Sequence, residues 1–377
     1  MSDRDQPIAA RLFDGFSAID AAAWDRCAGA ANPFVSYAFL SAMEDSGSAV
    51  AATGWQPLPI ALDDGQGFLP AYAKSHSQGE YVFDHGWADA WHRAGGSYYP
   101  KLQIAVPFSP VPGPRLLACD PAARPALIAA AEAVVKEHDL SSAHATFIDP
   151  GEVAIFEAAN WLIRTDRQFH WRNQGYGSFD DFLGALASRK RKAIRKERAS
   201  ALEDGLSVVH VTGSDITEAH WDAFWRFYQD TSSRKWGRPY LTRRFFSLIG
   251  ERMADRVLLI LTMRGSKPIA GALNLIGADT LYGRYWGAIE DVPFLHFELC
   301  YYQAIDAAIE RGLGRVEAGA QGEHKLARGY EAVTTWSAHF IPHPGFRRAV
   351  AEYLEAERRA IANNIAMLDT LTPFRRG

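Results

Sequence analysis

The chain has 377 residues, of which 48% are hydrophobic and 22% charged, and its formal net charge at pH 7 is -4. This length favours two domains, each large enough to bury its own apolar centre, and the composition is ordinary for a soluble globular protein. The small negative charge excludes a general electrostatic attraction for nucleic acid, so any contact with a polyanion has to be local.

The N-terminus and the cysteines bear on where in the cell the chain works. The first residues are charged and lack the apolar core of a secretory signal, and no window approaches the ~20 apolar residues that span a bilayer. We therefore expect a cytoplasmic protein without a membrane-spanning segment, and a peripheral role at the inner membrane surface stays open. Cys27, Cys119 and Cys300 are far apart and form no CxxC pair, which excludes a disulfide framework and gives no reason to expect zinc.

The first half of the chain alternates predicted helices and strands around one long irregular segment. Asn32-Pro33 is typical of a helix start. The segment 75–114 is rich in Gly, Pro, His and aromatic residues, and an irregular segment of this length usually carries function. In chain order we expect a helix at 21–28, strands at 55–62 and 67–75, a helix at 124–138, a strand at 144–149, a helix at 153–161 and a strand at 162–171.

The second half repeats the same kinds of elements in the same order, which indicates a duplicated mixed α/β unit. The predicted fold class is α/β with mixed sheets, in a first domain at 1–165 and a second at 166–345, followed by a C-terminal helix and tail at 346–377. We expect a basic helix at 180–203, a strand at 206–211, helices at 221–234 and 242–253, strands at 256–264, 267–277 and 280–288, a helix at 297–312 that Gly312 ends, strands at 314–319 and 334–341, and a helix from about 346 to 371.

The segment 188–198 combines helical spacing with a dense run of basic residues. Arg191, Arg195 and Arg198 share one helix face, and Lys196 lies on the next. Like charges so close together destabilise a helix unless an anion neutralises them, and arginine and lysine bind phosphate well. We assign Arg191, Arg195 and Lys196 to substrate binding; a solvated basic surface is the alternative.

The segment 317–330 follows a predicted strand and is dense in titratable side chains. Its glycines allow the backbone to approach a ligand closely, and open α/β sheets bind ligands beyond the ends of their strands. Lys325 is predicted to stabilise a carbonyl oxygen or balance phosphate charge, while Glu323 or His324 takes a proton from an attacking amine. Arg328, Gln321 and Glu317 are assigned to substrate binding, and a polar surface loop is the alternative.

The segment 84–92 combines aromatic and hydrogen-bonding side chains. We assign Asp84, His85 and Trp87 to the binding of a sugar or peptide acceptor; simple packing against a sheet is the alternative. The spacing of the Asp and His residues matches no zinc signature, so no metal site is expected. Tyr285, in the strand predicted at 280–288, is also assigned to substrate binding.

Several of these segments resemble a known family. The segment 188–208 resembles the K-x-R-x-x-I-R-K-A-x-K-x-G helix that enters the second domain of FemABX-type non-ribosomal peptidyl transferases. The segments 83–117, 295–330 and 334–340 are similar to the FemAB-like group of bacterial proteins often labelled as peptidoglycan biosynthesis or recognition proteins. The resemblance runs from about residue 32 to residue 342.

The resemblance implies a pair of GNAT-type domains side by side, with donor and acceptor meeting near their junction. FemABX relatives transfer an amino acid from aminoacyl-tRNA to an amine on a peptidoglycan precursor peptide. The segment HKLARGY takes the place of the group's F-K-x-x-F-G, so that Lys325 matches its lysine and Tyr330 falls near its phenylalanine-glycine. Two features depart from the family: His324 replaces the phenylalanine, and the coiled-coil arm of some relatives is missing.

Together these observations predict an N-acyltransferase that transfers an aminoacyl or acyl group to an amine. The expected donor is an aminoacyl-tRNA or an acyl-CoA, the acceptor is a peptidoglycan-precursor-like or small molecule, and tRNA is an alternative partner of the basic helix. We expect no covalent enzyme intermediate, because the sequence shows neither a GxSxG motif nor a Cys-His arrangement. The alternatives are an acetyl-CoA-dependent enzyme, although no segment matches Q/R-x-x-G-x-G/A fully, and a non-catalytic recognition module. The sequence does not indicate the oligomeric state.

Overall fold

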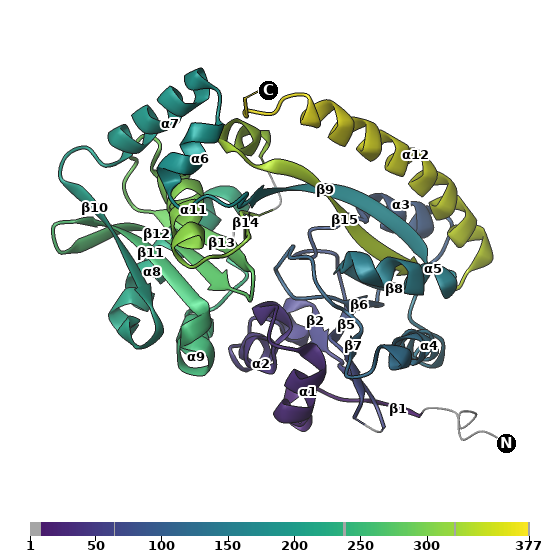
Figure 1. The fold of residues 1–377 in the computed structure, drawn as a ribbon. Coiled ribbons are helices and arrows are strands. Elements are labelled where there is room, and N and C mark those ends of the chain that lie inside the picture. The colour runs from purple at the N-terminus through teal and green to yellow at the C-terminus, as the bar shows by residue number, and fades with distance from the viewer. Residues whose placement is uncertain (1–8, 64, 237–238, 320–321, 376–377) are drawn as a thin grey trace. The chain divides into compact units, whose positions relative to one another are not determined.

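The computed structural model describes residues 9–63, 65–236, 239–319 and 322–375 (Figure 1). The chain forms two compact units. Unit 1 comprises Met1–Asp166 and Thr335–Ile361, and unit 2 comprises Arg167–Thr334 and Ala362–Gly377. The predicted domain limits, 1–165, 166–345 and 346–377, stay a prediction.

Unit 1 contains two sheets and a set of short helices (Figure 1). The first sheet has the order β1-β3-β4-β7, with β1 at Ala10–Leu12, β3 at Ile60–Leu62, β4 at Gly67–Leu69 and β7 at Leu117–Ala118. The second has the order β15-β8-β6-β5-β2, with β15 at Glu331–Phe340, β8 at Ala143–Ile148, β6 at Lys101–Ile104, β5 at Ala71–Lys74 and β2 at Trp55–Pro57. The helices are α1 at Ala21–Ala28, α2 at Tyr37–Asp45, α3 at His85–Arg93, α4 at Arg124–Glu137, α5 at Val153–Ala158 and the first part of α12, Pro344–Asp369.

Helix α4 packs its apolar face into the core of unit 1. Its apolar residues recur with helical spacing, and Leu127, Ile128 and Val135 are almost fully buried. They belong to one apolar cluster with residues of the strands β3, β6 and β8. Burying apolar surface in this way is the main favourable contribution to folding.

Two proline residues divide the predicted strands of unit 1. The strand expected at 55–62 is interrupted at Pro59, between β2 and β3, and the strand expected at 67–75 is interrupted at Pro70, between β4 and β5. Proline removes a backbone donor from the strand ladder, so it favours a break. After each break the chain continues in the other sheet, and the prediction of two long strands was therefore wrong.

The sequence had indicated that the segment 75–114 is irregular throughout, and this prediction was wrong. The segment contains helix α3 and strand β6. The helix buries Trp87 and packs Trp91 against it from one turn further on, so its apolar stripe consists of aromatic residues set among glycine and alanine. Composition counted over the whole segment conceals that stripe.

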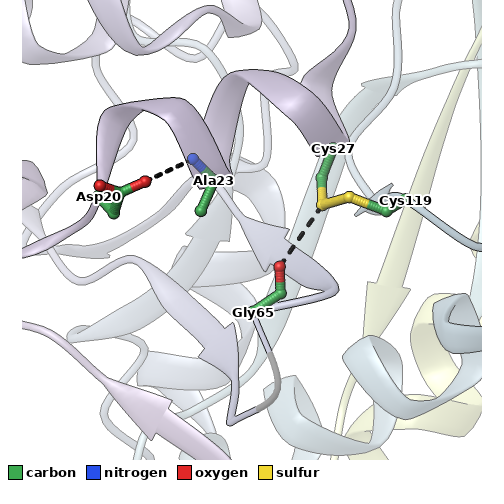
Figure 2. The surroundings of a disulfide bond; sticks show 5 residues. All are labelled: Asp20, Ala23, Cys27, Gly65 and Cys119. Atoms are coloured by element: carbon green, nitrogen blue, oxygen red, sulfur yellow. Dashed lines mark hydrogen bonds between the residues drawn. A yellow bond between two sulfur atoms is a disulfide. The ribbon is translucent and has the colours of Figure 1, made fainter.

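A disulfide bond joins Cys27 to Cys119 within unit 1 (Figure 2). Cys27 lies in the last turn of helix α1, which begins where the Asp20 side chain accepts a hydrogen bond from the backbone N–H of Ala23 at 2.6 Å. The two cysteines are 92 residues apart in sequence. The expectation of a chain without a disulfide framework is corrected to one disulfide and one free cysteine, Cys300.

Unit 2 is built on a sheet with the strand order β10-β11-β12-β13-β14-β9. Neighbouring strands run antiparallel except for β13 and β14, which are parallel. The strands are β10 at Leu206–Thr212, β11 at Val257–Arg264, β12 at Lys267–Ile276, β13 at Thr280–Ala288, β14 at Arg315–Glu317 and β9 at Leu162–Arg172. The helices are α6 at Phe179–Ala185, α7 at Ser188–Ala201, α8 at Glu218–Trp236, α9 at Arg243–Met253, α10 at Leu295–Phe297 and α11 at Gln303–Glu310.

Two predicted helices of unit 2 differ in detail from the structure. The helix expected at 180–203 is divided into α6 and α7, because Leu186 takes an extended conformation and pairs with Phe374. The helix expected at 297–312 contains a π-helical turn, Glu298–Tyr302, between α10 and α11. Gly312 follows α11 with a φ of +67°, in the left-handed region that favours glycine at a helix end.

Candidate functional site

The parallel pair β13 and β14 creates a pocket in unit 2. Pairing runs from Thr280 opposite Arg315 to Tyr282 opposite Glu317, where β14 ends and β13 continues. A cavity of about 120 Å³ lies where β13 continues alone, and we call it the β13–β14 pocket. It is lined by Ala272, Leu273, Asn274, Gly283, Arg284, Tyr285, Trp286, His296, Cys300, Tyr301 and Ala318.

The helical wall of the pocket contains the π-helical turn Glu298–Tyr302. π-helical turns are rare and are found frequently at functional sites. Cys300 and Tyr301 belong to this turn, and a hydrogen bond of 2.8 Å joins the Tyr301 hydroxyl to Nε2 of His324. Burial, together with the cations of Arg328 and Lys325, lowers the pKa of His324. His324 is therefore largely neutral at neutral pH.

Lys325 lies beside the pocket and is 1% exposed. Its Nζ donates a hydrogen bond of 2.7 Å to the carbonyl oxygen of Gly319, next to the pocket residue Ala318. Burial lowers the pKa of Lys325 to about 7, with Cys300 raising it and the Arg284 guanidinium lowering it. Both protonation states of this lysine are therefore populated near neutral pH, as a proton carrier requires.

Glu317 and His170 form a second buried titratable pair, opposite each other on β14 and β9. His170 Nδ1 lies 3.7 Å from Glu317 Oε1, and Glu317 Oε2 has no hydrogen-bond partner. Burial raises the pKa of Glu317 to about 8, against the lowering effect of Arg315 and Arg284. Burial likewise lowers the pKa of His170 to about 3. At neutral pH the carboxyl group is therefore mostly protonated and the imidazole is neutral.

Arg328 connects the Lys325 segment to helix α7. Its Nη2 donates to both carboxylate oxygens of Glu197 at 2.9 Å, and its Nε donates to the Tyr302 hydroxyl at 3.0 Å. The guanidinium also lies 3.6 Å from the ring centroid of Phe297. The contact between the basic helix and this segment is thus made by a carboxylate of α7, which neutralises Arg328.

The structure gathers part of the predicted site around the β13–β14 pocket. Tyr285 lines the pocket, whereas the Glu323 side chain is 63% exposed and lies 3.5 Å from Arg167. On α7, Arg195 and Lys196 are exposed, and Arg195 pairs with Asp180 at 2.8 Å. Gln321 lies outside the described residues. Of the other predicted residues, His324 contacts the lining residue Tyr301, and Glu317 directly precedes the lining residue Ala318. Arg328 instead contacts Glu197 and Phe297, which do not line the pocket.

Asp84, His85 and Trp87 belong to a separate site in unit 1. Asp84 is buried, pairs with the fully buried Lys101 and accepts a hydrogen bond of 2.7 Å from the Tyr98 hydroxyl. Burial alone raises the pKa of Asp84, but Lys101 outweighs that effect and holds the pKa well below its usual range. Asp84 is therefore a charged structural partner at neutral pH, whereas His85 is exposed.

Trp87 lies between this buried network and an apolar groove. The centroids of the Trp87 and His339 rings lie 4.9 Å apart, and a 2.6 Å hydrogen bond joins Nδ1 of His339 to Nδ1 of His144. The groove measures about 490 Å³ and lies between α3 and the first turns of α12. It is lined by Phe83, Gly86, Trp87, Ala90, Trp91, Ala94, His343, Gly345, Phe346, Ala349, Val350 and Tyr353.

Sequence reasoning missed Cys300, Tyr301 and His296 as pocket residues. His296 directly precedes the helix predicted at 297–312 and is four residues before Cys300, a spacing that places two residues on one face where the helix begins one residue earlier. It also missed Lys101, because nothing local distinguishes a buried lysine in a strand from an exposed one.

Among the described residues, no cluster of three or more His, Cys, Asp or Glu side chains has a metal-binding arrangement. Within the same residues, no helix is long and apolar enough to cross a membrane.

Comparison with known proteins places these observations in a family. The model of the FemAB-like family, described as peptidoglycan biosynthesis/recognition, matches residues 15–376. FemX shares 12% sequence identity with a TM-score of 0.55, over 88% of this chain and 98% of FemX. L-PGS from Bacillus licheniformis shares 8% identity with a TM-score of 0.51, over 89% of this chain and 96% of that chain. A conserved protein of unknown function from Bacteroides thetaiotaomicron shares 11% identity with a TM-score of 0.51, over 88% and 100%.

At these identities the similarity to solved structures concerns the fold. It confirms the mixed α/β fold that the sequence predicts. A search of curated protein sequences gives no significant match. The family match covers nearly the whole of both units and agrees with the resemblance of the segments 83–117, 295–330 and 334–340. The chain therefore belongs to the FemAB-like family of peptidoglycan biosynthesis and recognition proteins.

Proposed function

We propose that this protein is an N-acyltransferase that moves an aminoacyl or acyl group from an activated carbonyl donor to an amine of a peptidoglycan-precursor-like or small-molecule acceptor. The observation that carries the proposal is Lys325, a buried lysine beside a polar pocket. Burial lowers its pKa to about 7. A perturbed titratable group beside a pocket is typical of a catalytic site.

In this proposal Lys325 handles the proton of the attacking group. Its neutral form takes a proton from the nucleophile, and its ammonium form returns the proton to the leaving group. Arg284 and the Tyr301 hydroxyl, both in the pocket wall, stabilise the negative charge that develops on the carbonyl oxygen. Lys325 thus takes the proton-transfer role that the sequence had suggested for Glu323 or His324, because a pKa near 7 suits the lysine to that role.

An aminoacyl donor is favoured over acyl-CoA by the chain that precedes helix α10. A pyrophosphate is usually bound by backbone N–H groups of a glycine-rich turn at a helix N-terminus. Between Gly287 and Gly312 the sequence has no glycine, and Glu290 and Asp291 stand shortly before the helix. Carboxylates at that position repel a pyrophosphate. The exposed cations of α7 offer a local, salt-sensitive contact for the phosphates of a tRNA.

The test offers two donors to the purified full-length protein. Radiolabelled aminoacyl-tRNA or acetyl-CoA is mixed with a peptidoglycan stem peptide that carries a free amine, and label on the peptide is measured. We expect transfer from aminoacyl-tRNA, and a loss of ~100-fold or more in Lys325→Met. Arg243→Ala, which removes an ion pair with the exposed Glu218 in the same unit, serves as the matched control.

The alternatives give different results in the same assay. Transfer from acetyl-CoA alone identifies the CoA-dependent enzyme. Binding of the stem peptide without transfer from either donor, unchanged by Lys325→Met, identifies a recognition module and overturns the proposed function.

A further inference from the structure

Asn274 is a buried amide whose orientation is fixed and whose oxygen has no partner. It is fully buried and lies on β12 in the wall of the β13–β14 pocket. Its Nδ2 donates to the carbonyl oxygens of Leu258 and Ala272, both at 3.3 Å. Because carbonyl oxygens only accept hydrogen bonds, the amide nitrogen has to lie on their side and Oδ1 on the other. Oδ1 has no hydrogen-bond partner.

Gly283 leaves space in front of this oxygen. It pairs with Asn274 across the two strands and lines the same pocket. A methyl group added at position 283 would lie 3.3 Å from Asn274 Oδ1 and 3.5 Å from the carbonyl oxygen of Glu317. The strand register shifts at this point, with Arg284 as the extra residue of β13. Such bulges are over-represented next to active sites, where they redirect side chains.

The size of the pocket limits the group that reaches Asn274. A buried acceptor without a donor is unfavourable, so a molecule in the pocket that carries an N–H or O–H group is favoured. The cavity of about 120 Å³ has room for roughly four water molecules at ~30 Å³ each. A space of this size fits the small acyl end of a donor and excludes a peptide or a nucleotide.

The chemistry of an aminoacyl group matches this acceptor. In the proposed mechanism the donor carbonyl lies at Arg284 and Tyr301, in the same pocket wall as Asn274. An aminoacyl group has its amine one carbon away from that carbonyl, where a plain acyl group has only C–H bonds. The ammonium and the neutral amine both carry N–H groups, so either form is able to donate to Oδ1.

We propose that Asn274 selects the donor by accepting a hydrogen bond from its free α-amino group, in the space that Gly283 leaves. This inference rests on the acyl transfer proposed above and narrows its donor to an aminoacyl group. Asn274 takes no part in making or breaking bonds and acts as a specificity-determining residue. An acyl group without the amine leaves Oδ1 buried and unpaired, and this cost falls on the wrong donor alone.

The experiment compares two donors that differ only in the amino group. Alanyl-tRNA and propionyl-tRNA carry acyl chains of the same length, and glycyl-tRNA and acetyl-tRNA form a second such pair. Transfer of each group to the stem peptide by the full-length protein gives kcat/KM. In Asn274→Leu, which nearly keeps the size and removes the acceptor, the amino-to-deamino ratio is expected to fall by ~10- to 100-fold.

The comparison of ratios separates selection from folding. A smaller folded fraction lowers transfer from both donors equally, and the intrinsic reactivity of each ester is the same for every variant. Neither therefore changes the ratio between wild type and Asn274→Leu.

Gly283→Ala tests the same contact with Asn274 intact. The added methyl group occupies the space in front of Oδ1, so the ratio is expected to fall by ~10-fold or more. Gly184→Ala, in helix α6, is the matched control because a Cβ added there meets nothing within 4 Å. We expect it to keep the wild-type ratio, and melting temperatures check that each variant is folded.

The outcomes distinguish the inference from the proposed function. If Asn274→Leu and Gly283→Ala both keep the wild-type ratio, the selection role is overturned, Oδ1 is assigned to a bound water molecule, and the proposed function stands. If the wild type transfers none of the four groups, the proposed function itself fails, together with the inference that rests on it.

Discussion

Lys325 is a residue whose position is unfavourable for folding. An ammonium group loses hydration when it is buried, and a single hydrogen bond to Gly319 does not replace that hydration. The low pKa of Lys325, about 7, expresses this cost. A group that is retained at a cost to stability is usually there for function.

The cost predicts how stability depends on pH. Between pH 7 and the ordinary lysine pKa of about 10.4, the unfolded chain binds the proton and the folded chain does not, so the Lys325 contribution to stability rises with pH. Below pH 7 the penalty is fully present. Lys325→Met is therefore expected to stabilise the protein by on the order of 2–5 kcal/mol at pH 6, and by much less at pH 10.

Thermal unfolding of the wild type and Lys325→Met at the two pH values measures this difference. A melting temperature that is lower in Lys325→Met at pH 6 contradicts the burial argument. The expected gain in stability also separates function from folding, because the same variant is expected to lose transfer activity.

At the scale of secondary structure elements, two arginines of the basic helix α7 differ in how much they contribute to stability. Arg198 pairs with a buried carboxylate, whereas Arg195 makes only an exposed ion pair. Arg198 pairs with Glu298 at 3.0 Å and with Asp306 at 2.7 Å, and the Glu298 side chain is fully buried. Arg195, one turn earlier, makes an exposed pair with Asp180. Exposed pairs contribute little, whereas removing one partner of a buried pair leaves a charge without compensation.

Two alanine variants of α7 test this difference. Arg198→Ala is expected to cost about 3 kcal/mol of unfolding free energy at pH 7, and Arg195→Ala to change it by less than about 0.5 kcal/mol. Burial already raises the pKa of Glu298 against the effect of Arg198, and removing Arg198 raises it further. Because the folded variant then binds a proton that the unfolded chain does not, the deficit shrinks as the pH falls toward 4. Urea unfolding at pH 7 and pH 4 measures it, and equal losses in both variants contradict the assignment.

The same scale shows why α7 was only partly interpretable from sequence. The run of basic residues correctly indicated a helix, but its contact with the Lys325 segment is made by Glu197, which pairs with Arg328. Periodicity places residues on a face and does not reveal what that face meets. The assignment of Arg191, Arg195 and Lys196 to substrate binding stays a prediction.

At the scale of the whole chain, the disulfide between Cys27 and Cys119 closes a long loop within the first half of the sequence. The two residues are 92 positions apart. In the chain-entropy model such a cross-link disfavours the unfolded state, and removing it by Cys27→Ala/Cys119→Ala is expected to cost about 4–5 kcal/mol. Calorimetry is expected to show the loss in the melting of unit 1, with unit 2 unchanged.

Thiol titration checks the bond itself. The native protein is expected to present one reactive thiol, Cys300, and the reduced and unfolded chain three. Three reactive thiols in the native, unreduced protein contradict the disulfide. Disulfides persist in oxidising compartments and are rare in the cytosol, so the thiol count of protein alkylated during cell lysis also tests the predicted cytoplasmic location.

The sequence by itself determined the order and kind of most elements. Helix α1, the strands β8 to β13 and the C-terminal helix follow from local periodicity, and Gly312 marks the end of the helix that precedes β14. It also singled out Lys325, because glycines and titratable residues gather after a strand. These features are local, and a few neighbouring residues decide each of them.

Only the tertiary structure decided which distant residues meet. The β13–β14 pocket exists because two strands pair in parallel and one ends early, and it brings Cys300 and Asn274 to one cavity. The pairing of Cys27 with Cys119, and the burial of Lys101 beside Asp84, arise in the same way. Such contacts depend on how separate elements pack, and the local pattern of a sequence contains little information about the partner that each element will have.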